Sequence, residues 1–250
     1  MAMTRFSSLL LVLSMLISSQ SKSQVIIVPE TQTDGVILKQ QLWTCLIQNA
    51  EAQAIQAVLV VSITDRLNSQ VLSETSSSVI SLPVGMKRVT IQDQAPLSFG
   101  VTSLGFAADR PLNQPMPVGD YQVCYRLVEY RGKQSVLASE CIRFLSEPLS
   151  PPQLIQPEDG TTIIDPRPSL MWTPPTPVHM FTSLQYELKL VAVYDNQSAA
   201  EALQRNVPVI VMPTQVNSTA YPASYSNLEP GKKYAWQVTA MDGGRPGGAK

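Results

Sequence analysis

The chain has 250 residues, of which 44% are hydrophobic and 15% are charged, and its formal net charge is −1. A near-neutral chain without blocks of one charge sign lacks the basic surface that nucleic-acid binding requires. Its length is sufficient for one or two domains.

Residues 1–23 have the pattern of a secretory signal peptide. Arg5 supplies a positive start, residues 9–17 are almost all apolar, and Ser21 and Ser23 place small side chains before Gln24. The apolar run is too short for a stable membrane anchor, and no later run is long enough to span a bilayer. We therefore expect an exported protein without a membrane span, in the periplasm, on the cell surface or outside the cell.

Residues 24–147 alternate short strand patterns with turn residues, which predicts an immunoglobulin-like β-sandwich. The segment between Asp93 and Val118 fits no regular element and is either a long functional loop or an irregular edge. The expected strands are Val25–Val28, Val36–Gln48, Ala57–Asp65, Gln70–Ser76, Val79–Pro83, Lys87–Gln92, Tyr121–Glu129 and Val136–Phe144.

A Pro-rich linker at residues 148–151 precedes residues 152–250, which predict a fibronectin type III-like sandwich. A strand at residues 169–174 carries Trp172 as the expected core tryptophan. Residues 186–194 alternate apolar and polar side chains, which is typical of a half-buried strand.

Two further elements are expected between these strands and the end of the second half. Ser198 and Glu201 have the spacing of a capping box, which predicts a short helix over residues 199–205. Val209–Val211 lies between two prolines, which favours an edge strand because proline cannot donate to a central ladder.

The most specific motif lies in residues 228–240. Leu228, Pro230 and Tyr234 have the spacing of a tyrosine corner, in which the tyrosine hydroxyl bonds to upstream backbone. Tyr234 and Trp236 then begin an alternating strand. A similar segment in the first half leads into a strand at Tyr121, which indicates a weak internal repeat.

These patterns resemble secreted fibronectin type III-like proteins of the Bacteroidota, including those with a TANFOR region. The resemblance spans roughly residues 115–242 and implies a cell-envelope or secreted protein tied to the surface and secretion machinery of that phylum. The matching segments are Pro117–Tyr121, Ser139–Phe144, Pro151–Pro157, Leu170–Pro174, the helical insert and Leu228–Ala240.

The three cysteines leave at least one thiol unpaired within the chain. A two-residue type II′ turn that begins at Gly132 would place Cys124 opposite Cys141 on the outer face of a hairpin. The rival bridge joins Cys45 to Cys124 across the two sheets, which requires Cys124 to point inward against the alternation. We expect the Cys124–Cys141 disulfide and a buried thiol at Cys45.

No motif for catalysis, for a metal or for a cofactor is present in the sequence. The single histidine, His179, follows a Pro-rich segment and has no partner at a recognisable spacing. Zinc, EF-hand and P-loop patterns are absent. We therefore expect a protein that is not an enzyme and that uses no metal and no cofactor.

Four aromatic residues in expected loops are candidates for binding, namely Phe99, Phe106, Tyr221 and Tyr225. The other interpretation is that they pin loops to the core, because large apolar side chains are mostly buried.

The sequence thus predicts an all-β fold of two tandem immunoglobulin/fibronectin type III-like sandwiches, the second with a helical insert. We expect a non-catalytic role in protein interaction, adhesion, or cell-envelope or secretion-system scaffolding. The alternative is a glycan- or ligand-binding accessory module that uses the Asp93–Val118 segment. A row of coplanar exposed aromatics would favour the glycan, and a large apolar patch would favour a protein partner.

Residues 241–250 are rich in glycine and proline where the last strand of the second sandwich should begin. We expect either that the natural chain continues beyond Lys250 or that a partner supplies this strand by β-augmentation, and we favour the first.

Overall fold

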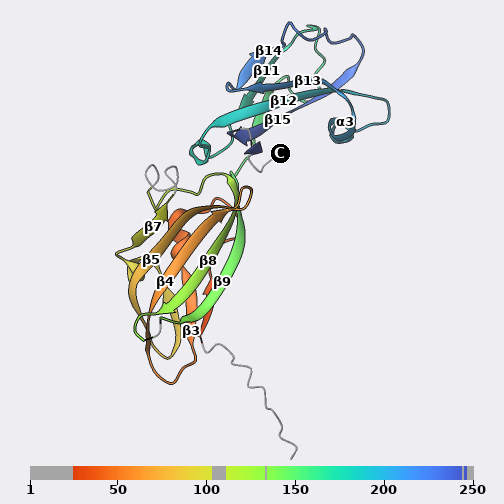
Figure 1. The fold of residues 1–250 in the computed structure, drawn as a ribbon. Helices are drawn as coiled ribbons and strands as arrows, with labels where there is room; N and C mark the ends of the chain where they lie inside the picture. The colour runs from red at the N-terminus through yellow and green to blue at the C-terminus, as the bar shows by residue number, and fades with distance from the viewer. Residues whose placement is uncertain (1–24, 103–110, 133, 244, 247–250) are drawn as a thin grey trace, which may run out of the picture.

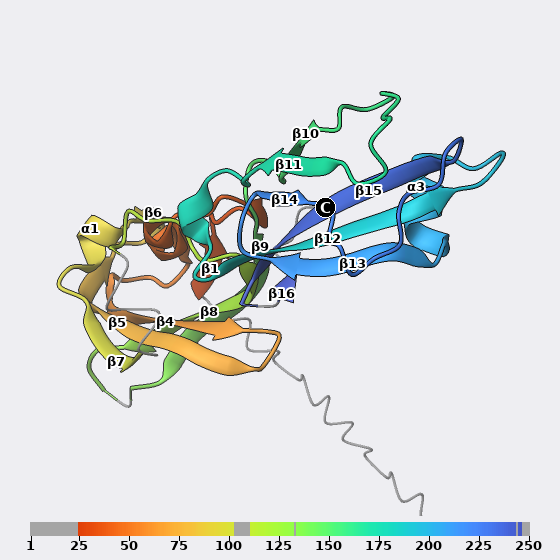
Figure 2. The same cartoon turned by 90° about the horizontal axis from the view of Figure 1, so that it is seen from above.

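The computed structural model describes residues 25–102, 111–132, 134–243 and 245–246 (Figure 1). Strands dominate, and the described α-helices are short: α1 (Ile91–Gln94) and α3 (Ala199–Arg205). The expected all-β fold of two tandem sandwiches is confirmed, and Figures 1 and 2 show one sandwich following the other. The predicted signal peptide and Phe106 lie outside the described residues.

The first sandwich, formed by residues 25–146, contains a three-stranded and a six-stranded sheet. The small sheet has the order β1 (Val25–Pro29), β3 (Cys45–Asn49), β6 (Gly85–Val89). The large sheet has the order β2 (Asp34–Gly35), β9 (Val136–Ser146), β8 (Gly119–Glu129), β4 (Ile55–Asp65), β5 (Gln70–Leu82), β7 (Ser98–Thr102). Strand β2 pairs with β9 in parallel, whereas the other pairs are antiparallel.

Side-chain alternation sets the core between the two sheets. On β8 the buried residues are every second one, Tyr121, Val123, Tyr125 and Leu127, and β4 follows the same rule. Each fully buried Leu, Ile or Val contributes about 1.5–3 kcal/mol relative to leaving it in water. The two sheets are therefore held face to face mainly by aliphatic side chains.

The segment 36–48 is not one strand, so this expectation is wrong. Strand β2 precedes this segment and pairs with β9 of the large sheet. The chain then forms a 3-10 helix (Lys39–Trp43) and enters β3 of the small sheet at Cys45. Leu42 and Trp43 of that helix are buried in the core. The apolar run therefore reflects packing by a helical turn, which periodicity alone does not separate from a strand.

The segments 70–76 and 79–83 form a single strand, β5, rather than two. Its pairing with β4 shifts register between Val58 and Val60. There the N–H of Leu59 donates to the Ser77 hydroxyl at 2.9 Å, so a side chain replaces the ladder bond that the bulge removes. A run of serines at residues 76–78 thus continues the strand instead of ending it.

The expected strand at residues 87–92 ends at Val89, because α1 begins two residues later. A capping box starts this helix: the Asp93 carboxylate accepts from the Thr90 N–H at 2.9 Å. Hydrogen bonds from the Thr90 backbone and hydroxyl hold the pKa of Asp93 below its usual value. The unassigned stretch after Asp93 contains the rest of α1 and β7, and residues 103–110 lie outside the described part.

The turn predicted at Gly132 is also wrong, although most of the hairpin register is right. The β8–β9 ladder shifts by one residue between Leu127 and Val128, and the Glu129 N–H donates to the Ser135 carbonyl at 3.0 Å. The loop is therefore wider than the two-residue type II′ turn. The predicted pairing of residues 121–127 is unaffected, because the shift lies beyond them.

The second sandwich, formed by residues 153–246, pairs a three-stranded with a four-stranded sheet (Figure 2). The first has the order β10 (Gln153–Gln156), β11 (Ser169–Thr173), β14 (Ser218–Ala220). The second has the order β13 (Pro208–Thr214), β12 (Leu184–Val193), β15 (Lys233–Asp242), β16 (Arg245–Pro246). As predicted from its flanking prolines, β13 is an edge strand.

The helical insert is confirmed as α3. The Ser198 hydroxyl accepts from the Glu201 N–H at 3.2 Å, and the Glu201 carboxylate accepts from the Ser198 N–H at 3.0 Å. Ala202 packs against Val191 of β12 and Ala235 of β15, which places α3 on the outer face of the sheet. A last strand also begins where the fold requires one, since β16 pairs with β15 at Met241 and Asp242.

A short interface joins the two sandwiches. The Val118 N–H donates to the Met180 carbonyl at 3.1 Å, and Ser150 and Thr176 exchange backbone hydrogen bonds of 3.1 and 3.3 Å. Met180 belongs to a 3-10 helix (Val178–Met180) of the second sandwich. Val36 and Val118 of the first sandwich pack against the second core, so the joint combines hydrogen bonds with apolar contacts.

Candidate functional site

The predicted structural residues of the second sandwich lie in or beside its core. Trp172 is fully buried, and its ring meets Tyr186 edge-on at 5.4 Å and Trp236 at 6.4 Å between centroids. Leu228 is buried, whereas Pro230 is exposed. The Tyr234 hydroxyl accepts a hydrogen bond of 2.9 Å from the Glu229 N–H, which is the upstream backbone contact that the motif predicts. These residues support the fold and offer no reactive group to a ligand.

In the first sandwich, Tyr121 is 5% exposed and stacks on Phe144 at 5.3 Å. The preceding Asp120 lies on the surface between two arginines. Arg143 donates to it twice, at 2.9 and 2.8 Å, and Arg66 donates at 2.9 Å. Partial burial would raise the pKa of Asp120, but these hydrogen bonds and positive charges hold it below its usual value. The cluster ties β8, β9 and the turn after β4 together.

The four candidate binding aromatics do not form one surface. Phe99 is 54% exposed on β7 of the first sandwich, while Tyr221 and Tyr225 belong to the second. Tyr221 is only 4% exposed, so its assignment to a binding surface is wrong. Tyr225 is half-buried, and its hydroxyl donates to the Val211 carbonyl at 3.0 Å, which pins its loop to β13.

An arginine explains why the loop around Tyr221 is held inward. Arg167 donates to the Asn227 side chain at 2.6 Å and to the carbonyls of Pro222 and Tyr225 at 3.1 and 3.2 Å. Its guanidinium also lies 5.7 Å from the centroid of the Tyr221 ring. Because the planar fork satisfies several acceptors at once, the loop has a fixed shape.

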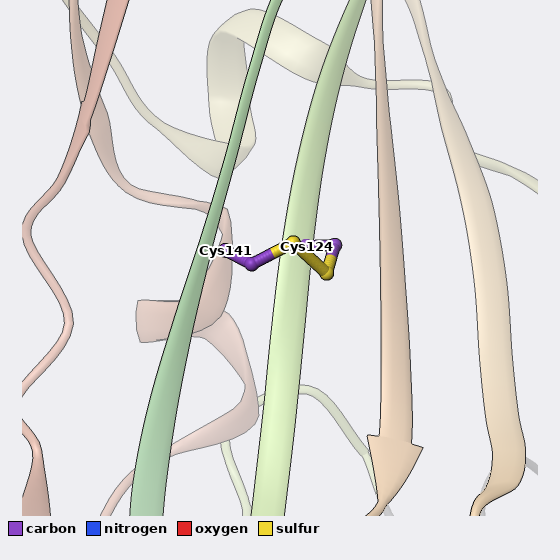
Figure 3. Close-up of a disulfide and its surroundings, with 2 residues drawn as sticks. All are labelled: Cys124 and Cys141. Atoms are coloured by element: carbon purple, nitrogen blue, oxygen red, sulfur yellow. A yellow bond between two sulfur atoms is a disulfide. The ribbon is translucent and has the colours of Figure 1, made fainter.

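The expected disulfide joins Cys124 to Cys141, which face one another on β8 and β9 (Figure 3). Cys45 is a free thiol with no exposed surface, which excludes the rival bridge to Cys124. Burial, followed by the charge of Glu30, raises the pKa of Cys45 to about 12. A thiol that stays protonated in the core is not a nucleophile.

The described residues offer little chemistry. No group of three His, Cys, Asp or Glu in this part of the chain could hold a metal ion. His179 is exposed in the 3-10 helix at the joint.

A hollow of about 560 Å³ at one end of the first sandwich is lined by residues 51–56, Glu129, Arg131 and Leu137. A second, of about 350 Å³, lies between β1 and β9 and has Glu140 as its charged lining residue.

The outer surface of the three-stranded sheet is apolar, which the sequence reasoning missed. Ile26, Val28 and Met86 are 50%, 49% and 66% exposed, and Leu46 is half-buried among them. Val28 lies opposite Leu46, and Ile26 lies opposite Gln48, which in turn faces Met86. We call these four apolar side chains and Gln48 the β1–β3–β6 face. Arg88 lies opposite Leu46 in the same row, and its ion pair with Glu30, at 2.6 Å, reaches from β6 to the end of β1.

A signal for this face was present in the sequence. Residues 25–28 are four consecutive apolar residues, so both faces of β1 had to be apolar. One set, Val25 and Ile27, is buried, and the other faces outward. The apolar run therefore accounts for both the buried and the outward-facing side chains of β1.

The opposite surface, on the six-stranded sheet, is mostly polar. One apolar cross-strand row has Val58 opposite both Val79 and Val128, and Val128 opposite Val136. The next row mixes Val60 with Arg126 and Ser139, and the row after it contains the disulfide. Apolar rows of this kind are what stabilising cross-strand pairs produce.

No family model and no curated protein matches the chain. Among solved structures, the chain is similar to domains A168–A170 from titin, with 10% identity, a TM-score of 0.27, and coverage of 83% of this chain and 71% of that one. None of the helices among the described residues has the length and apolar character needed to span a membrane.

Proposed function

We propose that this chain is a non-catalytic, exported module that binds a protein partner through the β1–β3–β6 face. The partner is a component of the cell envelope or of a secretion system. The predicted signal peptide and the surface disulfide support export, because such bonds persist in oxidising compartments. The resemblance to secreted proteins of the Bacteroidota supports the envelope.

The observation that carries this proposal is the exposure of Ile26, Val28 and Met86 on one outward-facing sheet surface. Apolar side chains grouped in adjacent rows beside an ion pair are the arrangement that marks interaction sites. The face belongs to regular strands, so its backbone is already in place before a partner arrives. A preformed surface loses little conformational entropy on binding.

The glycan alternative requires a row of aromatic rings. The exposed aromatic residues of the described chain are Phe99 on β7, Tyr130 in the loop after β8 and Tyr194 in the loop after β12. They lie on separate elements, and Tyr194 belongs to the other sandwich. An apolar aliphatic surface therefore favours a protein partner over a sugar.

The proposal is tested with paired lysine substitutions. Met86→Lys places a charge in the β1–β3–β6 face, and Val79→Lys places the same charge on the outer face of the six-stranded sheet, at a valine that is 40% exposed and lines neither hollow. We expect Met86→Lys to reduce recovery of the partner from envelope extracts about tenfold, as loss of an interface anchor does. Quantitative mass spectrometry of proteins captured by the tagged full chain measures this recovery.

Val79→Lys is expected to capture the same partner as the unchanged chain. Equal capture by both variants, or equal loss in both, would overturn the assignment of the face. A purified chain that forms a dimer, and whose dimer Met86→Lys dissociates, would show instead that the face binds a second copy.

A further inference from the structure

The Cys124–Cys141 disulfide lies outside the core of the first sandwich. Cys141 is exposed and Cys124 is half-buried, whereas the neighbouring Val123 and Tyr125 are buried on the other side of β8. Figure 3 shows the bridge between two adjacent strands of the sheet. A thiol in solution can therefore approach the bond without opening the core.

Strand pairing does not depend on the bridge. The register of β8 and β9 is regular on both sides of the cysteines, from Gly119 opposite Ser146 to Leu127 opposite Ala138. On the core side of the same strands, the stacked Tyr121 and Phe144 also hold the pair together. The two strands thus stay aligned when the sulfur–sulfur bond opens.

The charges around the bridge favour a thiolate. Because side chains alternate along a strand, Arg126 and Arg143 share the outer face with the cysteines two residues away. Arg143 is paired with Asp120, but no described residue forms an ion pair with Arg126. The acid in the cysteine row, Glu74, lies two strands from Cys124, beyond Ser62. Arg126 is therefore a cation without an ion pair on the same outer face as Cys124, whereas the exposed Glu140, next to Cys141, points to the other side of β9. A cation beside a departing thiol lowers its pKa.

We propose that this disulfide is a thiol-exchange site that a dithiol or a protein thiolate attacks while the protein stays folded. The attacking thiolate forms a bond with Cys141 Sγ, and the Cys124–Cys141 bond breaks. Cys124 Sγ leaves as a thiolate beside Arg126 and takes a proton from water. With a dithiol, the second sulfur then attacks the mixed disulfide and releases Cys141, so the dithiol is oxidised as the protein is reduced. The inference does not rest on the β1–β3–β6 face.

The test measures how fast dithiothreitol reduces the full chain in native buffer, with alkylation and mass spectrometry of each cysteine. We expect the rate to rise in proportion to the reductant concentration, while the near-ultraviolet circular dichroism keeps its folded signal. Cys45 should remain unalkylated, because it is buried. A rate that is independent of the reductant and equal to the rate of unfolding would overturn the proposal.

Arginine variants separate a positioned site from a merely exposed bond. Arg126→Gln should slow the exchange roughly two- to threefold, because one nearby charge no longer stabilises the leaving thiolate. Arg205→Gln removes an exposed arginine from α3 of the second sandwich and should leave the rate unchanged. Equal rates in the unchanged chain and both variants would show that Arg126 has no part in the exchange.

Discussion

The two sandwiches are fastened in different ways. In the first, a covalent bond joins two strands that already pair along their length. In the second, side chains hold loops: the Tyr234 hydroxyl binds the backbone of Glu229, and Arg167 binds the loop around Tyr221. The disulfide adds stability to a strand pairing that the backbone hydrogen bonds of the sheet already define. The side-chain hydrogen bonds help to define the loop conformation itself, because loops lack the regular backbone hydrogen bonds of a sheet.

The largest expected effect comes from removing the disulfide, which closes a loop with a sequence separation of 17. By the chain-entropy model, replacing Cys124 and Cys141 together with serine should destabilise the first sandwich by about 3 kcal/mol. Urea unfolding followed by hydrogen exchange of peptides from each sandwich measures this change. The second sandwich should keep its protection.

The double serine variant has a built-in control. Adding reductant should destabilise the unchanged chain and leave the variant as it was. If reductant shifts both chains equally, or if protection is lost in the second sandwich, then the bridge does not act on the first sandwich alone.

A smaller effect is expected at the tyrosine corner. Tyr234→Phe keeps the ring but removes the acceptor of the Glu229 N–H, which should cost about 1 kcal/mol and affect only the second sandwich. Thermal unfolding with hydrogen exchange of the 228–242 segment reports the loss. Tyr194→Phe serves as the matched control, because that ring is 62% exposed and its hydroxyl makes none of the hydrogen bonds described here. Equal stability of the two variants would show that the hydrogen bond to the Tyr234 hydroxyl does not stabilise the second sandwich.

The smallest effect is the acid sensitivity of the first sandwich. Since folding lowers the pKa of Asp120, its ionised form stabilises the fold above the pKa of the unfolded chain. That contribution disappears as the pH falls through the lower, folded value. Asp120→Asn should therefore lose less unfolding free energy on acidification than the unchanged chain does. Urea unfolding midpoints measured across the acid range report this difference. The same pH dependence in Asp120→Asn and the unchanged chain would show that the Arg66–Asp120–Arg143 cluster does not stabilise the first sandwich.

Local patterns predicted those features that depend on neighbouring residues. Alternation placed Cys124 opposite Cys141, and the spacing of Ser198 and Glu201 marked the start of α3. The contact of Tyr234 with upstream backbone also followed from a short motif. In each case the physical cause lies within a few residues or within one hairpin, so a single sequence contains it.

The features that sequence reasoning missed depend on distant parts of the chain. The 3-10 helix at Lys39–Trp43 forms because Leu42 and Trp43 fill a space that both sheets create. The continuity of β5 depends on Ser77, whose hydroxyl completes a bulge in β4. The exposure of Ile26 and Met86 depends on which face of each strand the rest of the sandwich covers. None of these can be read from local spacing.

The central claim is that the β1–β3–β6 face binds a protein partner, and crosslinking in the cell that exports the full chain tests it most directly. A photoreactive amino acid replaces Met86 in one variant and Val79 in the other, and adducts are identified by mass spectrometry. We expect one defined protein adduct from residue 86 and none of that protein from residue 79. The same adducts from both residues, or an adduct from residue 79 alone, would contradict the account.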